Sequence, residues 1–170
     1  MSLPSGFDLA RMQLSDLDQV IAIENTVYPH PWSQQNFADS LHQDHDAWVV
    51  RKQSVDGSAQ EMLGYFVQMA VVDEMHILNV AVTPSAQGQG IGLYLLSQMA
   101  IHANLLEMES LLLEVRASNQ RAIQVYDTFG FAYIGRRKGY YPSTQSQRED
   151  ALVMRLMLRD LISSVNHPIT

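Results

Sequence analysis

The sequence predicts a single-domain α/β or α+β sandwich with a mixed sheet, and three observations support this class. Its 170 residues are close to the ~150 residues of an average domain. After two early helices, strand-like and helix-like patterns follow in the order strand, strand, helix, strand, helix, strand, strand. No repeat, linker or low-complexity segment divides the chain. We therefore expect one domain over residues 1–158 and a polar C-terminal tail over 159–170.

The N-terminal half combines strands with two helices. Residues 7–12 alternate in character and predict a strand, and Ser15 and Asp16 can cap a helix that runs to Val27. The apolar side of that helix is expected to hold Leu17, Val20, Ile21 and Ala22. Ser33 caps a second, short helix, whose inward face is expected to hold Phe37, Ala38 and Leu41.

The middle of the chain predicts an antiparallel meander. Strands are expected at 47–52, 62–72 and 75–83, with a hairpin turn at Asp56-Gly57. The longest helix follows at 90–106, and a nearly continuous apolar strand at 111–116 belongs at the sheet centre. The last expected elements are a helix at 118–129, stopped by Gly130, and strands at 131–137 and 149–158.

Composition excludes several kinds of function. The chain has no cysteine, which excludes disulfides, thiolate zinc sites, iron–sulfur clusters and a cysteine nucleophile. No apolar run approaches the ~18 residues of a membrane span, and no secretion signal is visible, so we expect a cytoplasmic protein without a membrane partner. The histidines show no metal-ligand spacing, so no metal is expected.

Charge is unevenly distributed. The chain has 11 basic and 18 acidic residues, a net charge of −7, which argues against direct nucleic-acid binding. Residues 1–75 carry 3 − 11 = −8 and residues 76–170 carry 8 − 7 = +1. This is either solvated surface, or an acidic half that attracts a cationic substrate beside a half that holds an anionic cofactor. Glu24, Asp44 and Asp46 are expected at the surface, where they could attract a basic peptide.

A glycine-rich loop is the most informative segment. After a strand and Pro84, Gly88, Gly90 and Gly92 precede the long helix. Glycines let backbone N–H groups approach a ligand, and a helix N-terminus favours anions, so the loop suits a pyrophosphate. It is neither a P-loop, which needs Gly-Lys-Ser/Thr, nor a dinucleotide fingerprint, which needs a third glycine at Leu93 or Leu95. A plain surface turn remains the alternative.

The segment Gln87-x-x-Gly90-x-Gly92 resembles the Gln/Arg-x-x-Gly-x-Gly/Ala motif of the Gcn5-related N-acetyltransferases (GNAT). The runs 112–119 and 122–131 are similar to the second cofactor-contacting half of that superfamily. Residues 30–33, 113–119, 140–142 and 148–151 more particularly resemble the bacterial ribosomal-protein-alanine N-acetyltransferases, the RimI family. The resemblance covers about residues 7–158.

This resemblance implies a GNAT-type fold, with a mixed, mostly antiparallel central sheet and helices on both faces. It implies acetyl transfer from acetyl-CoA to the N-terminal alanine of a small-subunit ribosomal protein, by direct attack in a ternary complex. The expected partner is the basic N-terminal peptide of that protein. The alternatives are another protein N-terminus, a lysine or a polyamine as acceptor, or a CoA-binding protein without catalysis. Retention of Glu114 and Tyr126 argues against the last alternative.

The family's cofactor positions fall on a strand end, the glycine loop and the start of the next helix. They are Val80, Ala81, Val82, Gln87, Gly88, Gln89, Gly90, Ile91, Gly92, Leu93 and Asn119. Gly88 and Leu93 stand where the family often has arginine, so this protein would rely more on backbone N–H groups. Asn119 is expected to bond the pantetheine arm or, alternatively, to cap its helix.

The resemblance makes Glu114 the general base and Tyr126 the acid that protonates the CoA thiolate. Strand alternation places Leu112, Glu114 and Arg116 on one side, so a structural Glu–Arg pair is the alternative for Glu114. Tyr126 also fits an apolar helical stripe of ordinary core packing.

Two aromatic residues are weaker candidates for binding the substrate. Tyr141 is expected either to line the peptide channel or to shape the loop between the last strands. Trp32 is expected either to wall the acceptor site or to plug the core.

Overall fold

The computed structural model describes residues 6–52, 60–142 and 148–165. The chain forms two compact units: unit 1 comprises Met1–Met69 and Leu78–Met99, and unit 2 comprises Ala70–Ile77 and Ala100–Thr170. The predicted Asp56-Gly57 turn lies outside the described residues. No helix in the described ranges is long and apolar enough to cross a membrane.

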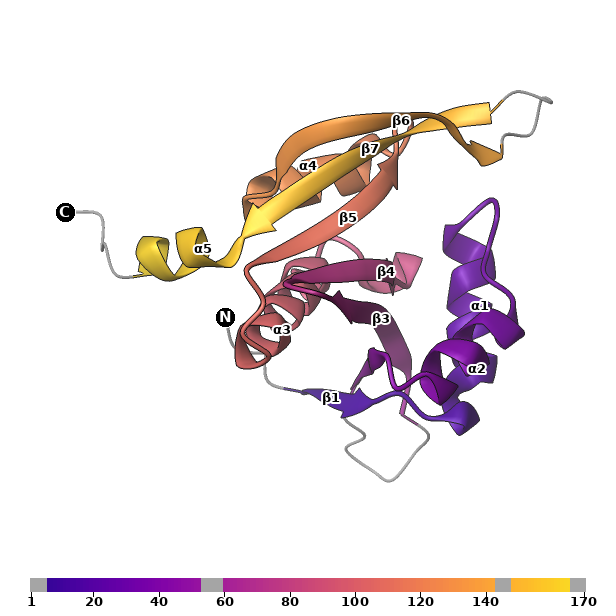
Figure 1. Cartoon of the computed structure of the whole chain (residues 1–170). Helices are drawn as coiled ribbons and strands as arrows, with labels where there is room; N and C mark the ends of the chain where they lie inside the picture. Colours follow the sequence, from indigo (N-terminus) through magenta and orange to yellow (C-terminus); the bar gives the residue numbers. More distant parts are fainter. Residues whose placement is uncertain (1–5, 53–59, 143–147, 166–170) are drawn as a thin grey trace. The chain divides into compact units, whose positions relative to one another are not determined.

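Helices and strands are interspersed along the chain (Figure 1). They are β1 (Phe7–Arg11), η1 (Leu14–Asp16), α1 (Leu17–Val27), α2 (Gln34–His42), β2 (Asp46–Lys52), β3 (Met62–Val71), β4 (Glu74–Val82), η2 (Pro84–Ala86), α3 (Ile91–Leu105), β5 (Ser110–Arg116), α4 (Gln120–Phe129), β6 (Ala132–Pro142), β7 (Arg148–Met157) and α5 (Leu158–Val165).

The hydrogen-bonded strand order is β1-β2-β3-β4-β5-β7-β6. The start of β4 pairs in parallel with β5, whereas β1–β2, β2–β3, β5–β7 and β6–β7 are antiparallel. The predicted mixed and mostly antiparallel sheet is therefore confirmed. β7 is inserted between β5 and β6, so the last two strands are not in sequence order.

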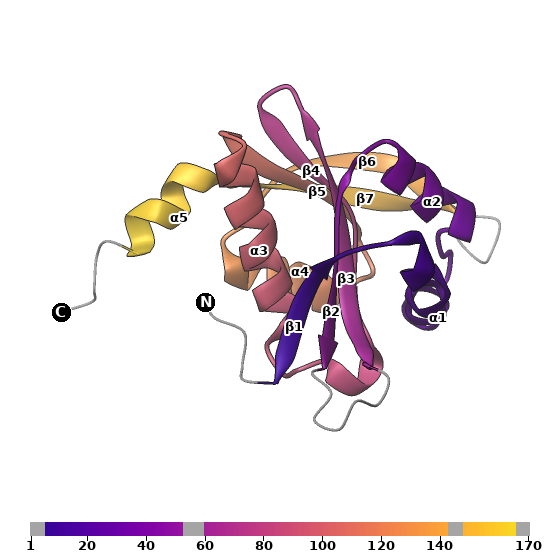
Figure 2. The same ribbon diagram turned by 90° about the horizontal axis from the view of Figure 1, so that it is seen from below.

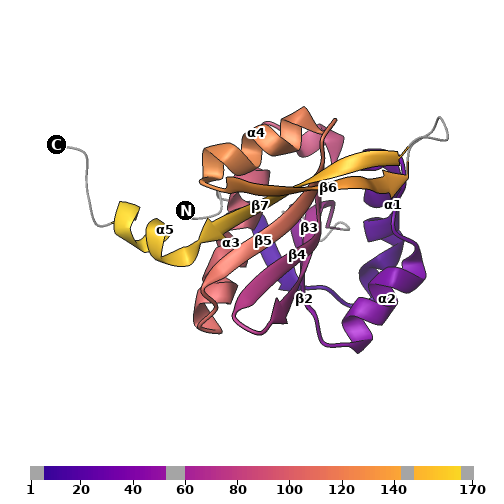
Figure 3. The ribbon, with the colours of Figure 1, turned by 45° about the horizontal axis from the view of Figure 1, so that its top comes forward.

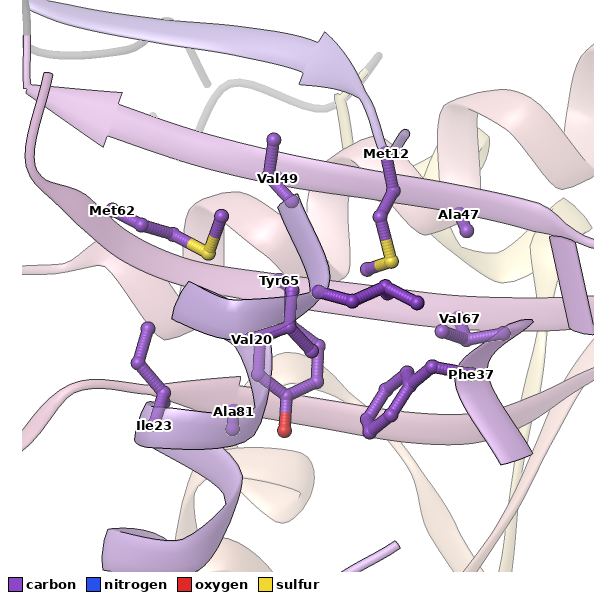
Figure 4. Packing of buried hydrophobic residues seen from close by; sticks show 11 residues of the cluster. Met12, Val20, Ile23, Phe37, Ala47, Val49, Met62, Tyr65, Val67 and Ala81 are labelled. Carbon is purple, nitrogen blue, oxygen red and sulfur yellow. The ribbon is translucent and has the colours of Figure 1, made fainter. Parts of the chain in front are cut away.

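In unit 1, helices cover both faces of the sheet (Figure 2). Side chains from α1 and α2 pack on one face around Tyr65, and Figure 4 shows Val20 and Phe37 beside its ring. On the other face α3 comes close to Gly64, because a Cβ at that residue would lie 3.4 Å from the Leu95 side chain. The same Cβ would lie 2.6 Å from the Ala81 carbonyl oxygen of β4. Only glycine fits this point of β3 without a shift of the backbone.

The buried face of α1 differs from the prediction. Leu17 and Val20 are buried as expected, but Ile23 and Glu24 complete the face, and Ala22 is exposed. Ala22 follows Leu17 by five residues, which places it about 140° around the helix from that side chain. Ile21 is partly buried against the core as expected, so Ala22 is the one predicted member of the face that is wrong.

In unit 2, β5 runs beside β7 (Figure 3), and the burial of its side chains alternates from Leu111 onward as the sequence predicts. Leu111, Leu113 and Val115 are buried on the face whose β7 partners include Leu152 and Met154, two residues that α4 also approaches. The opposite face carries Glu114 and the other even-numbered residues of the strand. α4 packs on the apolar face, so Glu114 lies on the opposite face, beside Leu112 and Arg116 of β5 and across from Val153 of β7.

The last two strands differ from expectation. β6 continues to Pro142, whereas the sequence predicted an end at 137. A register irregularity between Arg137 and Tyr141, with Gly139 at φ +57°, lets the ladder resume at Tyr141 opposite Glu149. Tyr141 is therefore a strand residue rather than a loop residue.

The expected C-terminal tail also begins with regular structure. β7 ends at Met157, and α5 occupies Leu158–Val165. Leu158 is buried, and its N–H donates to the Glu109 carbonyl at 3.0 Å. This bond ends the strand and starts the helix that the sequence analysis missed.

Candidate active site

The predicted site residues form two groups, one in each unit. The end of β4, the glycine loop and Trp32 belong to unit 1. Glu114, Asn119, Tyr126 and Tyr141 belong to unit 2.

The glycine loop has the backbone that its sequence suggests. Gly88 and Gly90 adopt φ values of +80° and +83°, a region that side chains rarely tolerate. A Cβ at Gly88, Gly90 or Gly92 would meet no atom within 4 Å, so the space beside this backbone is open. The first bond of the helix joins Tyr94 N–H to Gly90 at 3.0 Å, and the first-turn amides before it lack intrahelical acceptors. The loop therefore fits a pyrophosphate group.

Two glutamines stabilise this loop. The Gln87 side-chain amide donates to the Val82 carbonyl at 2.9 Å, and that of Gln89 donates to the Ser85 carbonyl at 2.9 Å. Both bonds tie the loop to the end of β4 or to η2. A contact of either side chain with the cofactor stays a prediction.

Tyr28, at the end of α1, engages the strand that is expected to hold the acetyl group. Its hydroxyl donates to the Val80 carbonyl at 2.6 Å. The bond joins residues that are 52 positions apart in the chain. Sequence reasoning missed Tyr28, because nothing local to it marks a partner so distant.

Glu24 is buried in unit 1, contrary to the expectation from the sequence. It is only 1% exposed, although the sequence analysis placed it at the surface. Its Oε1 accepts from Trp32 N–H at 2.7 Å and from the Asn79 amide at 3.1 Å, and its Oε2 accepts from the Tyr65 hydroxyl. Burial and the charge of Glu24 raise the pKa of Tyr65. The spacing Leu17, Val20, Glu24 was the signal for its burial.

Trp32 lies against the core of unit 1. Its ring centre is 5.2 Å from that of Phe37, and its N–H is held by Glu24. The half-buried ring thus has the packing role that was one of the two expectations. Its role at the acceptor site stays a prediction.

Glu114 has an arginine partner, but not the expected one. Arg137 Nε lies 3.0 Å from Glu114 Oε1, whereas Arg116 pairs with Glu149 at 3.3 Å. The carboxylate is 20% exposed, so it is sheltered yet still reaches solvent. The expected pairing of neighbours on β5 is wrong, because the β7 and β6 strands supply both partners.

Two predicted site tyrosines, Tyr141 and Tyr126, belong to the same unit as Glu114. The Tyr141 hydroxyl donates to the Glu114 carbonyl at 3.2 Å. Burial, with a smaller contribution from the charge of Glu114, raises the pKa of Tyr141 to about 12. Burial, followed by the influence of Tyr141, raises the pKa of Tyr126 to about 12. Tyr126 therefore keeps its proton at neutral pH and can act as a donor.

Tyr126 and Asn119 also have structural roles. The Tyr126 ring centre is 5.8 Å from that of Phe131, in keeping with the expected apolar stripe of α4. The Asn119 side chain accepts from Ala122 N–H at 3.2 Å and caps the helix. The capping prediction is thus confirmed, and a bond from Asn119 to the pantetheine arm stays a prediction.

Among the described residues, no group of three or more histidine, aspartate or glutamate side chains is arranged to hold a metal ion. Unit 2 offers the sheltered Glu114 carboxylate, Tyr141, whose hydroxyl bonds the Glu114 backbone carbonyl, and Tyr126, whose pKa is influenced by Tyr141. Unit 1 offers the glycine loop, with open space beside its backbone. These groups can take a proton from a nucleophile and return one to a leaving group.

The sequence matches the acetyltransferase (GNAT) family over residues 17–131. The [ribosomal protein bS18]-alanine N-acetyltransferase of Escherichia coli K12 is 32% identical over 148 residues, which cover 87% of this chain and 95% of that protein. The enzyme of the same name from Salmonella typhimurium LT2 is 32% identical over 145 residues, covering 85% and 93%. The crystal structure of the E. coli ribosomal-protein-S18-alanine N-acetyltransferase superposes with a TM-score of 0.78 and 32% identity, over 89% of this chain and 94% of that one.

Proposed function

The chain belongs to the acetyltransferase (GNAT) family, and from that membership we propose that it acetylates the N-terminal alanine of ribosomal protein bS18, with acetyl-CoA as donor. The observation that carries the proposal is a cluster in unit 2, in which the Tyr141 hydroxyl bonds the backbone carbonyl of Glu114 and Tyr141 in turn influences the pKa of Tyr126. The cluster holds one sheltered carboxylate and two tyrosines that keep their protons at neutral pH.

An N-terminal amine suits this cluster. An α-amino group has a pKa of about 7.7–8.0, against about 10.4 for lysine, so part of it is already neutral at pH 7. Glu114 accepts the remaining proton of the attacking nitrogen, directly or through water. Tyr126 donates its proton to the departing CoA sulfur. From the neutral amine, the nitrogen forms the bond to the acetyl carbon as the bond to sulfur breaks, and it loses one proton while the sulfur gains one. An amine that arrives as ammonium releases one further proton to solvent, and direct attack needs no covalent enzyme intermediate.

Unit 1 supplies the expected acetyl-CoA site. The open backbone at Gly88, Gly90 and Gly92 supports a role in binding the pyrophosphate. Backbone groups of Val80, Ala81 and Val82 would hold the pantetheine arm and the acetyl carbonyl, and an N–H there would stabilise the developing oxyanion. The remaining expected positions in unit 1 are Gln87, Gln89, Ile91 and Leu93, and Asn119 of unit 2 would bond the pantetheine arm.

The acceptor is proposed to be a basic peptide. Residues 1–75 carry a net charge of −8, which would attract an arginine-bearing N-terminus. Tyr141 would contact this peptide, since its hydroxyl is already held beside Glu114. Trp32 would wall the acceptor site.

The proposal is tested by mixing the purified protein with acetyl-CoA and a short peptide that begins Ala-Arg, and following release of free CoA. Parallel reactions contain the same peptide with a blocked N-terminus, a lysine peptide, or spermidine. Turnover only with the free Ala-Arg terminus, lost in Glu114→Gln, is the expected result. Turnover on lysine or spermidine alone would overturn the proposed acceptor.

A further inference from the structure

We propose that Arg137 is a displaceable counter-ion of Glu114. Its guanidinium occupies the position that the acceptor's ammonium group takes when substrate binds. The proposal deepens the proposed function and rests on it, because it assigns a positioning residue to the proposed base. Arg137 thereby selects for acceptors with a free, positively charged amine.

The strand order brings these two residues together. Glu114 on β5 lies opposite Val153 on β7, and Val153 lies opposite Gly135 on β6. Arg137 follows Gly135 by two residues on β6, so its side chain emerges on the same face and reaches across β7. Arg137 itself lies opposite Ala151 on β7, whose small side chain takes up little space beneath the arginine.

The two partners are held to different degrees. Arg137 is 57% exposed, whereas Glu114 is 20% exposed and sits on a strand between buried neighbours. Nε of Arg137 is 3.0 Å from Oε1 of Glu114. Among the described residues, this guanidinium is the one charged group paired with the carboxylate. A pair with one well-exposed, flexible member is the kind that a competing cation can open.

The displaced arginine has a second contact in place. Its guanidinium carbon lies 5.2 Å from the centre of the Tyr140 ring, within the range of a cation–π interaction. The guanidinium therefore keeps its contact with Tyr140 when it moves away from Glu114. The exchange costs less than the release of an isolated cation into solvent.

The chemistry of the two cations makes the exchange productive. A guanidinium does not give up its proton in proteins, so Arg137 can hold the carboxylate without reacting. An α-ammonium that replaces it has a pKa of about 7.7–8.0 and can pass its proton to Glu114. A blocked or acetylated N-terminus carries no charge and cannot displace the arginine.

The direct test follows the Nε–H signal of Arg137 by NMR in protein labelled with ¹⁵N-arginine and saturated with CoA. Arg137→Lys assigns the signal, and Glu114→Gln gives its unpaired position. Alaninamide is expected to move the signal toward the unpaired position, and N-acetylalaninamide is expected to leave it unchanged. The proposal would be overturned if the chemical shift of the Arg137 signal did not change in Glu114→Gln, or if both compounds changed it equally.

Kinetics supply the second readout, with a matched control on the neighbouring residue. Arg136 points to the opposite face, where its Nε lies 2.6 Å from Asp150. Arg137→Gln is expected to lower KM for the Ala-Arg peptide about two- to fivefold, the range for a partly exposed ion pair, and Arg136→Gln is expected to leave it unchanged. An equal or higher KM in Arg137→Gln would contradict the proposal.

The two readouts separate this inference from the proposed function. Binding of alaninamide needs no turnover and no particular peptide. If the arginine signal moves but no Ala-terminated peptide is acetylated, the acceptor is wrong and the counter-ion role stands. If the peptide is acetylated and the signal stays still, the counter-ion role alone fails.

Discussion

The guanidinium carbon of Arg116 lies 4.4 Å from the centre of the Tyr141 ring. The same side chain donates to the Pro142 carbonyl at 2.9 Å and faces Glu149 at 3.3 Å, and Glu149 accepts from Ser118 N–H at 2.6 Å. Arg116 therefore joins β5 to the end of β6 and positions the ring whose hydroxyl reaches Glu114. Arg116, two residues after the proposed base, therefore positions the proposed substrate tyrosine and does not pair with Glu114.

Arg116→Lys is expected to raise KM for the Ala-Arg peptide about three- to tenfold. Lysine keeps the charge but loses the planar fork that stacks on Tyr141 and bonds Pro142. Arg121→Lys, at an exposed position of α4, is the control and should change nothing. Steady-state kinetics with saturating acetyl-CoA measure the effect, and an unchanged KM would show that Tyr141 does not depend on Arg116.

Glu24→Gln is expected to destabilise the fold by about 2 kcal/mol, since an amide can no longer accept all the bonds that the carboxylate accepts. Its NH₂ group would confront a donor from Trp32, Asn79 or Tyr65. Urea denaturation measures the loss. The matched control is Glu61→Gln at an exposed position, which should stay within about 0.5 kcal/mol of the parent.

Gly90→Ala is expected to weaken acetyl-CoA binding by tenfold or more. The residue has φ +83°, where alanine costs about 1–2 kcal/mol, and the new methyl group would enter the open space proposed for the pyrophosphate. Gly6→Ala carries the same kind of strain at φ +99°, also in open space, but outside the proposed site. Calorimetric titration should show normal affinity for Gly6→Ala, and an equal loss in both variants would refute a local role.

Alkaline pH is expected to destabilise the protein in part through Tyr126. Its native pKa of about 12 exceeds the value of about 10 for an unfolded tyrosine. Between these values the unfolded state loses the proton first, so the free energy of unfolding falls as pH rises, by at most about 2.7 kcal/mol from this group. Below pH 10 the group contributes no pH dependence.

Tyr126→Phe should remove this part of the alkaline slope, while the ring keeps its contact with Phe131. Tyr133→Phe is the control, since Tyr133 is 59% exposed. Denaturant titrations from pH 9 to 12 measure the slope. An identical slope in Tyr126→Phe and the parent would contradict the raised pKa.

Local patterns predicted most of the helices and strands. Alternation along β5 correctly placed Glu114 and Arg116 on the face opposite Leu113, and the capping role that was the alternative for Asn119 is confirmed. Such features depend on neighbours within a few residues, and the sequence displays them directly.

Partners that depend on strand order could not be predicted. Because β7 is inserted between β5 and β6, Glu114 pairs with Arg137, 23 positions away in the chain. Arg116 pairs with Glu149, 33 positions away. The burial of Glu24 belongs to the same class, because its partner Asn79 is 55 positions away. Only the helical spacing of Glu24 from Leu17 and Val20 gave a local sign.

The most direct test of the central proposal is mass spectrometry of ribosomal protein bS18 after incubation with the enzyme and acetyl-CoA. The account predicts one added acetyl group, located on the N-terminal alanine by fragmentation, and none with Glu114→Gln that still binds acetyl-CoA. Acetylation on internal lysines alone, or full N-terminal acetylation by Glu114→Gln, would contradict it.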